Sequence, residues 1–328
     1  MSARQLCGRS VQPIGLGCMN LSWAYGEPPE HAEKIRLLNE ALDHGYDHLD
    51  TANIYGQGKN EELLAEAVMH RRGEFLLASK TGIIVDGARR GIDCSPDAIT
   101  QSLDASLTRL KTDHIDLFYM HRFDPKVPIA DSVGAMQRAI EAGKIGAYGV
   151  SEWSAAHIRE AHACYPVGAV QTELSLWTRN VELGVLDATV TLGIPLVAFS
   201  PVGRGALGGV LKNPAKLSEK DLRRKMPRFS EENWPVNRQL IERFDAIAAR
   251  EGLAPAQLAL AWVLDQGANV HAIPGTTSIA HMAENFTAGS IAVDRAVLDE
   301  AGAVINTLTV AGHRYPEMIR PTIDTEEY

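Results

Sequence analysis

Short apolar runs alternate with longer amphipathic stretches along most of the chain. In the amphipathic stretches, apolar residues recur at helical spacing, as at Ile35, Leu38, Ala41 and Leu42. Strands that alternate with helices in this way indicate βαβ units and a parallel sheet. The strand-like runs predict eight strands, at 14–19, 48–50, 75–80, 115–121, 145–150, 169–172, 195–200 and 270–274.

This alternation predicts an α/β fold, a (β/α)8 TIM barrel in which loops at the C-terminal face form the active site. Such a barrel typically needs about 250 residues, so the 328 residues fit a single barrel domain over 1–328. The remaining segments are expected to be additions to the barrel. They are a hairpin or cap at 4–12, a loop at 82–95, an excursion at 203–235, and a polar tail at 313–328 that folds over the barrel mouth or packs at the surface.

Composition and charge exclude several classes of function. The formal net charge of −9 argues against a general nucleic-acid-binding surface. No apolar run reaches the roughly 18 residues of a membrane span, and the N-terminus lacks the apolar core of a signal peptide. We therefore expect a cytoplasmic location and no membrane partner. The four cysteines are scattered without CxxC spacing, which favours neither a zinc site nor a redox pair.

Four chemically complementary residues follow or end predicted strands. Asp50, Lys80 and His121 each lie at a strand end, and Tyr55 lies five residues after Asp50. The C-terminal ends of barrel strands meet at one face, so these side chains should meet there. An ammonium lowers the pKa of a nearby phenol, a buried ammonium needs a carboxylate, and imidazole can hydrogen-bond a carbonyl oxygen. Each residue alone is more simply structural, but the ordered set suits proton delivery to a carbonyl under reduction.

The order Asp-x4-Tyr-Gly, Lys and His at strand ends resembles the aldo-keto reductase superfamily, from Gly15 to Asn285. The resemblance implies an NADPH-dependent oxidoreductase that reduces ketones or aldehydes to alcohols. It makes Tyr55 the general acid, with a pKa lowered by Lys80. Asp50 supports Lys80, and His121 orients the carbonyl in a substrate pocket that also contains Trp23. We expect no metal ion, because the Tyr–Lys–His cluster polarises the carbonyl.

The resemblance also implies the nicotinamide contacts. Ser151 and Gln171 would hold the carboxamide, and Phe199 would stack on the ring. Glu152 departs from the Ser-Asn pair common in the family, and an ionised carboxylate can only accept hydrogen bonds. A plain helix start is an equally good interpretation of Glu152.

Two later segments are expected to bind phosphates. The letters GxGxxG occur at 203–208, but this position late in a barrel does not fit a Rossmann fingerprint. Backbone N–H groups of 200–205, with Arg204, could instead contact a pyrophosphate. By resemblance, 276–281 surrounds the adenosine 2′-phosphate. The full set of implied cofactor contacts is Gly17, Cys18, Met19, Asp50, Ser151, Glu152, Gln171, Phe199, Ser200, Pro201, Gly203, Arg204, Gly275, Thr276, Thr277, Ser278, His281, Glu284 and Asn285.

Two other functions remain open at this point. The first is a redox-sensing regulatory subunit that binds NADPH and turns over slowly. The second is a barrel isomerase or lyase in which Lys80 forms a Schiff base, and borohydride would trap its substrate. The sequence names neither the substrate nor the oligomeric state. Because 275–283 contains no Arg or Lys, we expect only a modest preference for NADPH over NADH.

Overall fold

Eight parallel strands form the centre of the computed structural model, which describes residues 3–86 and 89–328. They form one sheet in the order β12-β11-β10-β9-β8-β5-β4-β3. A parallel bridge from Ile14 to Ala272 brings the two outer strands together, so the sheet is a nearly closed barrel and the predicted fold class is confirmed. The strands are β3 (Leu16–Gly17), β4 (His48–Asp50), β5 (Leu76–Thr81), β8 (Ile115–Met120), β9 (Ile145–Ser151), β10 (Ala169–Glu173), β11 (Leu196–Phe199) and β12 (Val270–Ile273).

Two glycines allow the backbones to approach closely at the seam of the barrel. A Cβ atom on Gly17 would lie 2.7 Å from the carbonyl oxygen of Ile273. A Cβ atom on Gly275 would lie 2.9 Å from the carbonyl oxygen of Gly17. Distances this short exclude a side chain at either position, so β3 and the end of β12 can meet only with glycine there.

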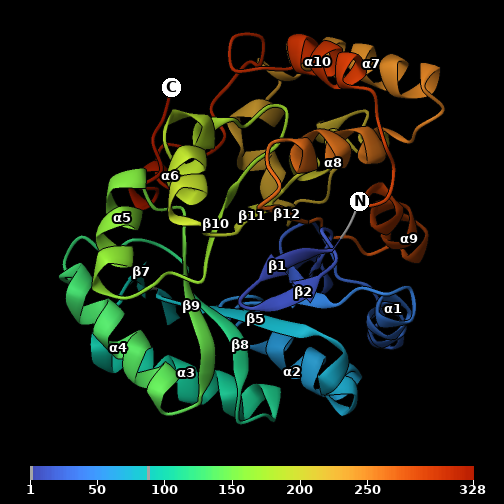
Figure 1. Cartoon of the computed structure of the whole chain (residues 1–328). Coiled ribbons are helices and arrows are strands. Elements are labelled where there is room, and N and C mark those ends of the chain that lie inside the picture. Colours follow the sequence, from blue (N-terminus) through green and yellow to red (C-terminus); the bar gives the residue numbers. More distant parts are fainter. Residues whose placement is uncertain (1–2, 87–88) are drawn as a thin grey trace.

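Helices surround the barrel on the outside (Figure 1). Apolar residues on their inner faces pack against the strands, as the helical periodicity predicted. The α-helices are α1 (His31–Asp43), α2 (Lys59–Ala67), α3 (Pro96–Leu110), α4 (Ile129–Glu141), α5 (Ala155–Cys164), α6 (Val185–Leu192), α7 (Trp234–Arg250), α8 (Pro255–Asp265), α9 (Ile279–Ala288) and α10 (Arg295–Val304). The 3-10 helices are η1 (Met19–Leu21), η2 (Met69–Glu74), η3 (Asn180–Leu183), η4 (Gly203–Gly205), η5 (Pro214–Lys216), η6 (Leu222–Lys225), η7 (Pro227–Phe229) and η8 (Arg320–Thr322).

The N-terminal hairpin closes one end of the barrel, as predicted for residues 4–12. It consists of β1 (Arg4–Leu6) and β2 (Arg9–Val11), which pair antiparallel and lie across the middle of the barrel in Figure 1. Leu6 and Val11 are buried in one cluster with Leu117 and Val197 from the barrel strands. Because this end is filled with side chains, an active site is left to the opposite, C-terminal end of the strands.

The segment 82–95 differs from the predicted loop. It contains a second antiparallel hairpin, of β6 (Ile83–Asp86) and β7 (Arg89–Ile92), in which Ile83 pairs with Ile92. The glycines suggested a loop, but the β-branched run that starts at Ile83 favours a strand. Gly87, one of those glycines, lies outside the described residues.

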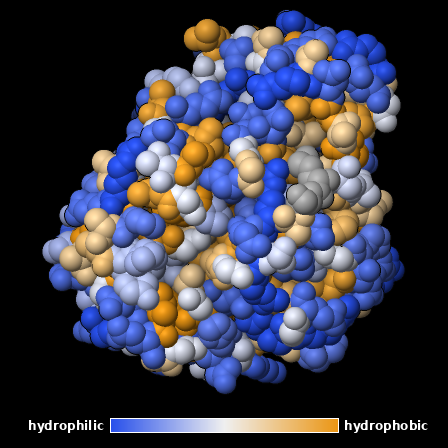
Figure 2. Space-filling view, viewed as in Figure 1, coloured by the Kyte–Doolittle hydropathy of each residue, from blue (hydrophilic) through white to orange (hydrophobic). Residues whose placement is uncertain are grey.

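The surface is mostly polar on the face shown in Figure 2, where hydrophobic residues occur in small scattered groups. Individual apolar side chains are exposed elsewhere in the chain, such as Leu308 at 95% and Met318 at 81%. Single exposed apolar residues are ordinary on globular proteins. Within the described part of the chain, no helix combines the length and apolarity that a membrane crossing requires.

Candidate active site

The four predicted catalytic residues lie together at the C-terminal end of the strands. Lys80 of β5 is fully buried, and its ammonium donates to the Asp50 carboxylate and to the Thr51 carbonyl at 2.8 Å. The same ammonium lies 3.4 Å from the Tyr55 hydroxyl. The rings of Tyr55 and His121 stand edge to face with their centroids 6.0 Å apart. The ends of neighbouring strands thus bring Asp50, Lys80 and His121 together, with Tyr55 beside them.

Tyr55 lies in the loop between β4 and α2. Three consecutive residues after it, at 56–58, have left-handed backbones with φ of 58°, 56° and 91°. The buried side chain of Asn60 fixes this loop through three hydrogen bonds. It accepts from the Thr51 hydroxyl at 2.6 Å and donates to the Cys18 carbonyl at 2.9 Å and the Ser22 hydroxyl at 2.8 Å. Asn60 was not predicted from the sequence, although it is the second residue of α2, close to the turn.

Burial decides the electrostatics of the site. Burial raises the pKa of Tyr55 above its usual value, and this outweighs the lowering effect of Lys80. Burial alone would lower the pKa of Lys80, but the Asp50 carboxylate and the Tyr55 hydroxyl raise it above its usual value. Burial, Arg122 and Lys80 together hold the pKa of His121 well below its usual range. At neutral pH the site therefore contains a protonated phenol, an ammonium and a neutral imidazole.

The residues predicted to contact a nicotinamide lie on the neighbouring strands. Ser151 ends β9 and is in register with Gln171 of β10, and both are buried. The Gln171 amide donates to the Asp50 carboxylate at 2.8 Å, which joins this side of the site to the catalytic cluster. Phe199 ends β11 and keeps part of its ring exposed. Gly17 ends β3, and Cys18 and Met19 follow it; the Cys18 N–H donates to the Asp50 carbonyl at 2.9 Å.

Glu152 and Arg204 have partners within the protein. Glu152 is fully buried, and its carboxylate forms an ion pair with Arg314 of the tail, with 2.7 Å between Oε2 and Nη2. Arg204, predicted near a pyrophosphate, pairs with the buried Glu173 at 2.8 Å. Burial would raise the pKa of Glu173, but Arg204 and other nearby guanidinium groups hold it below its usual value. Glu173 ends a strand as Asp50 does, so the strand-end rule could have identified it. Arg314 gave no local signal.

The two predicted phosphate segments have contrasting structures. In 200–205, Ser200, Gly203 and Arg204 have left-handed backbones, with Pro201 buried between them. The second segment leads into α9, and the Ser278 hydroxyl caps this helix by accepting from the His281 N–H at 3.3 Å. Thr277 and His281 are exposed there. Gly275, Thr276, Glu284 and Asn285 are half-buried or buried. A capped helix start with exposed polar groups suits an anionic group.

Trp23, which the resemblance placed in the substrate pocket, is 47% exposed. Trp177 and Trp234 are buried and both contact the Phe229 ring, so they stabilise loops. Tyr315 lies against the guanidinium groups of Arg204 and Arg314. Trp23, unlike these three buried side chains, is therefore available to a bound molecule.

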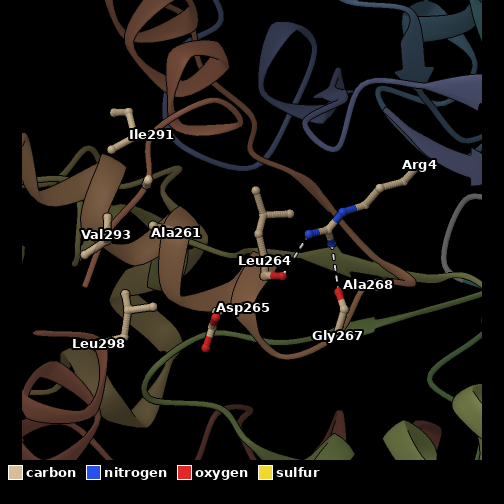
Figure 3. Close-up of a pocket in the computed structure, with 10 residues that line it drawn as sticks. Arg4, Ala261, Leu264, Asp265, Gly267, Ala268, Ile291, Val293 and Leu298 are labelled. Atoms are coloured by element: carbon tan, nitrogen blue, oxygen red, sulfur yellow. Dashed lines mark hydrogen bonds between the residues drawn. The ribbon is translucent and has the colours of Figure 1, made fainter. Parts of the chain in front are cut away.

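A cavity of about 360 Å³ lies at the other end of the barrel (Figure 3). The Arg4 side chain extends into it from the N-terminal hairpin and donates to the carbonyls of Leu264 and Gly267 at 3.0 and 2.9 Å. None of the predicted site residues lines this cavity. The chemistry therefore belongs to the cluster around Lys80 and not to this cavity.

Known proteins are similar to this chain over nearly its whole length. The profile of the Aldo/keto reductase family matches residues 13–305. A Schizosaccharomyces pombe protein named aldo-keto reductase yakc, NADP(+), is 39% identical over 95% of this chain and 94% of its own length. A Glycine max protein named probable aldo-keto reductase 1 is 39% identical over 94% of this chain and 89% of its own length.

Solved structures show the same fold at lower identity. The glycerol dehydrogenase of Gluconobacter oxydans has a TM-score of 0.84 at 24% identity, over 100% of this chain and 98% of that one. An aldo/keto reductase from Klebsiella pneumoniae, solved in complex with NADP and acetate, has a TM-score of 0.72 at 23% identity, over 96% and 99% of the two chains. With its barrel, its Asp-Tyr-Lys-His cluster and two relatives at 39% identity, this chain belongs to the aldo/keto reductase family.

Proposed function

We propose that this protein is an NADPH-dependent carbonyl reductase that converts ketones or aldehydes to alcohols in one barrel domain. The observation that supports it most is the position of the Lys80 ammonium. It contacts the Asp50 carboxylate and lies 3.4 Å from the Tyr55 hydroxyl, at the open end of the barrel. This arrangement places the protonated, neutral phenol of Tyr55 next to the fixed ammonium of Lys80. A proton donor of this kind is needed where a carbonyl oxygen becomes an alkoxide.

In this proposal each residue has one role. Tyr55 donates its proton to the developing alkoxide, and the adjacent Lys80 ammonium stabilises the phenolate that remains. Asp50 balances the buried ammonium. His121 is neutral because its pKa is well below the usual range, so it can donate a hydrogen bond to the carbonyl oxygen without a proton change. Trp23, Tyr55 and His121 would contact the substrate.

The cofactor site fits a nicotinamide dinucleotide phosphate. NADPH, when bound, supplies the hydride. Ser151 and Gln171 would hold the carboxamide, and Phe199 would lie against the ring. The capped start of α9, with Thr276, Thr277 and Ser278 before it, offers hydroxyl and backbone donors for a phosphate. The NADP(+) in the name of the yeast relative and the NADP of the Klebsiella complex support this choice.

The Schiff-base alternative is disfavoured by the state of Lys80. Schiff-base chemistry needs a neutral amine, and lysines of this kind usually have lowered pKa values. The pKa of Lys80 is raised instead, because Asp50 and Tyr55 offset its burial. Borohydride should therefore trap no carbonyl substrate on Lys80. Labelling that depends on Lys80 would favour the isomerase or lyase.

The test is NADPH oxidation by the purified protein across aldehydes, aromatic ketones, sugars and cyclic ketones. Turnover on the order of 1 s⁻¹ or faster with at least one class supports the reductase, since this is the lower end of typical enzyme rates. Tight NADPH binding without turnover on any class would favour the regulatory-subunit alternative. Failure to bind NADPH would overturn both.

A further inference from the structure

The last sixteen residues, 313–328, lie against the segment that follows β9; we call them the C-terminal strap. Arg314 of the strap is 3% exposed and forms a two-fold contact with Glu152. Its Nη2 lies 2.7 Å from Oε2, and its Nη1 donates to Oε1 at 3.1 Å. The backbone N–H groups of Asp324 and Thr325 both donate to the Glu152 carbonyl, at 3.1 and 3.0 Å. The strap thus holds Glu152 by its side chain and its backbone.

Glu152 needs this support because its backbone is strained. Its φ of +60° lies in the left-handed region, which is unfavourable for a residue other than glycine. The other polar groups of Glu152 are held by β10. Its N–H donates to the Gln171 carbonyl at 3.0 Å, and its Oε1 accepts from the Glu173 N–H at 2.9 Å. The strained turn is therefore fixed between a barrel strand and the strap, directly after Ser151.

The strap also fixes the helix behind this turn. The Ser154 N–H donates to the Asp324 carboxylate at 2.7 Å, and the Ala155 N–H donates to the Glu326 carboxylate at 2.8 Å. Both N–H groups belong to the start of α5, where carboxylates compensate unpaired donors and the helix dipole. The segment 152–155 therefore depends on the strap for its conformation.

Arg314 also compensates the negative charge of buried carboxylates. Its Nη1 lies 3.5 Å from the Glu173 carboxylate, which also pairs with Arg204. Glu152 and Glu173 are both fully buried, so they need these two guanidinium groups. Removing one partner of a buried ion pair leaves an uncompensated charge, which is strongly unfavourable. Loss of Arg314 would leave Glu152 buried without a cation and favour opening of the turn.

We propose that Arg314 and Glu152 are positioning residues that shape the nicotinamide end of the cofactor site, an inference that rests on the proposed function. They contact each other and not the reacting atoms. Their pairing fixes the left-handed turn after Ser151, and so the direction in which the Ser151 side chain meets the carboxamide. The adenosine end, at the start of α9, is built by a different part of the chain and does not depend on the strap.

The experiment compares binding of the whole cofactor with binding of its adenosine half. NADPH and adenosine 2′,5′-bisphosphate are titrated into the natural protein and into Glu152→Gln, Arg314→Met and Arg314→Lys. Arg320→Met is the matched control, since Arg320 is a half-exposed arginine of the same strap that pairs only loosely with Glu327. We expect the Kd of NADPH to rise about tenfold in Glu152→Gln and Arg314→Met, as is typical for coupled sites, and less in Arg314→Lys. The Kd of the bisphosphate should stay unchanged throughout, and Arg320→Met should match the natural protein.

Two other outcomes would contradict a positioning role. An equal loss of affinity for both ligands would show general loosening of the barrel, and unchanged NADPH affinity would show that the strap has no role in the site. If Arg314→Met fails to fold, Glu152→Gln decides, because it keeps the shape of the side chain and the acceptor for the Glu173 N–H. A natural protein that binds the bisphosphate but not NADPH, or neither, would overturn the proposed function itself.

Discussion

The amide of Gln171 donates a 2.8 Å hydrogen bond to the Asp50 carboxylate, so one contact joins the predicted cofactor side of the site to the predicted catalytic side. Asp50 is also the partner of the Lys80 ammonium. A carboxylate between these two donors has a fixed orientation. The position of Lys80, and through it the environment of Tyr55, therefore depends partly on β10.

Replacement of Gln171 by leucine should weaken both the fold and the site. The buried Asp50 oxygen would lose its donor, and an unsatisfied buried polar group costs about 1–3 kcal/mol. NADPH affinity should also fall, because the donor to the carboxamide is lost. Urea unfolding and NADPH titration measure the two effects. Gln137→Leu, which removes an exposed amide bonded to Glu141, is the control and should change neither. Unchanged stability in Gln171→Leu would show that Asp50 does not need this bond.

Tyr55→Phe tests the proton donor. The phenyl ring keeps the shape of the side chain, so NADPH should bind with normal affinity. Carbonyl reduction should fall by about 10²–10⁴, the usual contribution of a general acid. The measurement is kcat with the best carbonyl substrate, together with the Kd of NADPH. Near-normal turnover would exclude Tyr55 as the donor. Tyr165→Phe, a half-buried tyrosine next to Tyr148, serves as the control.

Much of this fold followed from the alternation of apolar and amphipathic segments. Asp50, Lys80 and His121 could be grouped because strand ends share one face of a barrel, a rule that needs no knowledge of side-chain packing. The pairing of Arg314 with Glu152 spans 162 residues and depends on where the C-terminal strap lies. No local pattern reports such a contact. Glu173 lies at a strand end and could have been placed at this face, but its pairing with Arg204 also depends on how the chain folds after β11.

Lys80→Met should depress turnover at neutral pH. Without the ammonium, only the Arg122 charge still opposes the effect of burial on Tyr55, so its pKa should rise further and its phenolate should be less stable. Asp50→Asn should have a smaller effect, since Lys80 still donates to the Thr51 carbonyl at 2.8 Å. The measurement is kcat for both variants and for the double variant. If Asp50 acts only through Lys80, the double variant should match Lys80→Met, and a much larger loss would contradict this shared pathway.

Two buried histidines inside the barrel should make the fold sensitive to acid. Burial and Lys80 lower the pKa of His48 from 6.5 to about 3, and burial and His48 lower that of His271 to about 4. Protonation is therefore easier in the unfolded chain. The stability that the two neutral histidines contribute is fully present above pH 6.5. It is lost as the pH falls from 6.5 toward their lowered pKa values. At pH 5 each histidine should remove about 2 kcal/mol, at roughly 1.4 kcal/mol per pH unit.

Urea unfolding of the natural protein, His48→Leu and His271→Leu between pH 8 and pH 5 measures this dependence. The absolute stability at pH 8 serves as the reference for each protein. Each variant should lose about half of the acid sensitivity that the two histidines provide. A slope that stays the same in both variants would assign the acid sensitivity to other groups, such as carboxylates paired in the fold.

The last prediction is that NADPH is preferred over NADH, but only modestly. Hydroxyls precede α9, and the Ser278 cap leaves a helix start that favours an anion. No Asp or Glu lies in 275–283 to repel a phosphate. The structure removes one source of positive charge, because Arg204 is paired with Glu173 at 2.8 Å. His281, exposed in the first turn of α9, is then the only basic side chain in residues 275–283.

The measurement is kcat/KM with both cofactors for the natural protein, His281→Ala and Thr277→Val. We expect the NADPH-to-NADH ratio to exceed one in the natural protein and to fall in both variants, because each loses a group that can meet the 2′-phosphate. NADH activity itself should be unchanged, since NADH lacks the 2′-phosphate that these two side chains would contact. Better use of NADH by the natural protein would overturn the cofactor choice. An unchanged ratio in His281→Ala alone would assign phosphate recognition to the hydroxyls and the helix start, without the histidine.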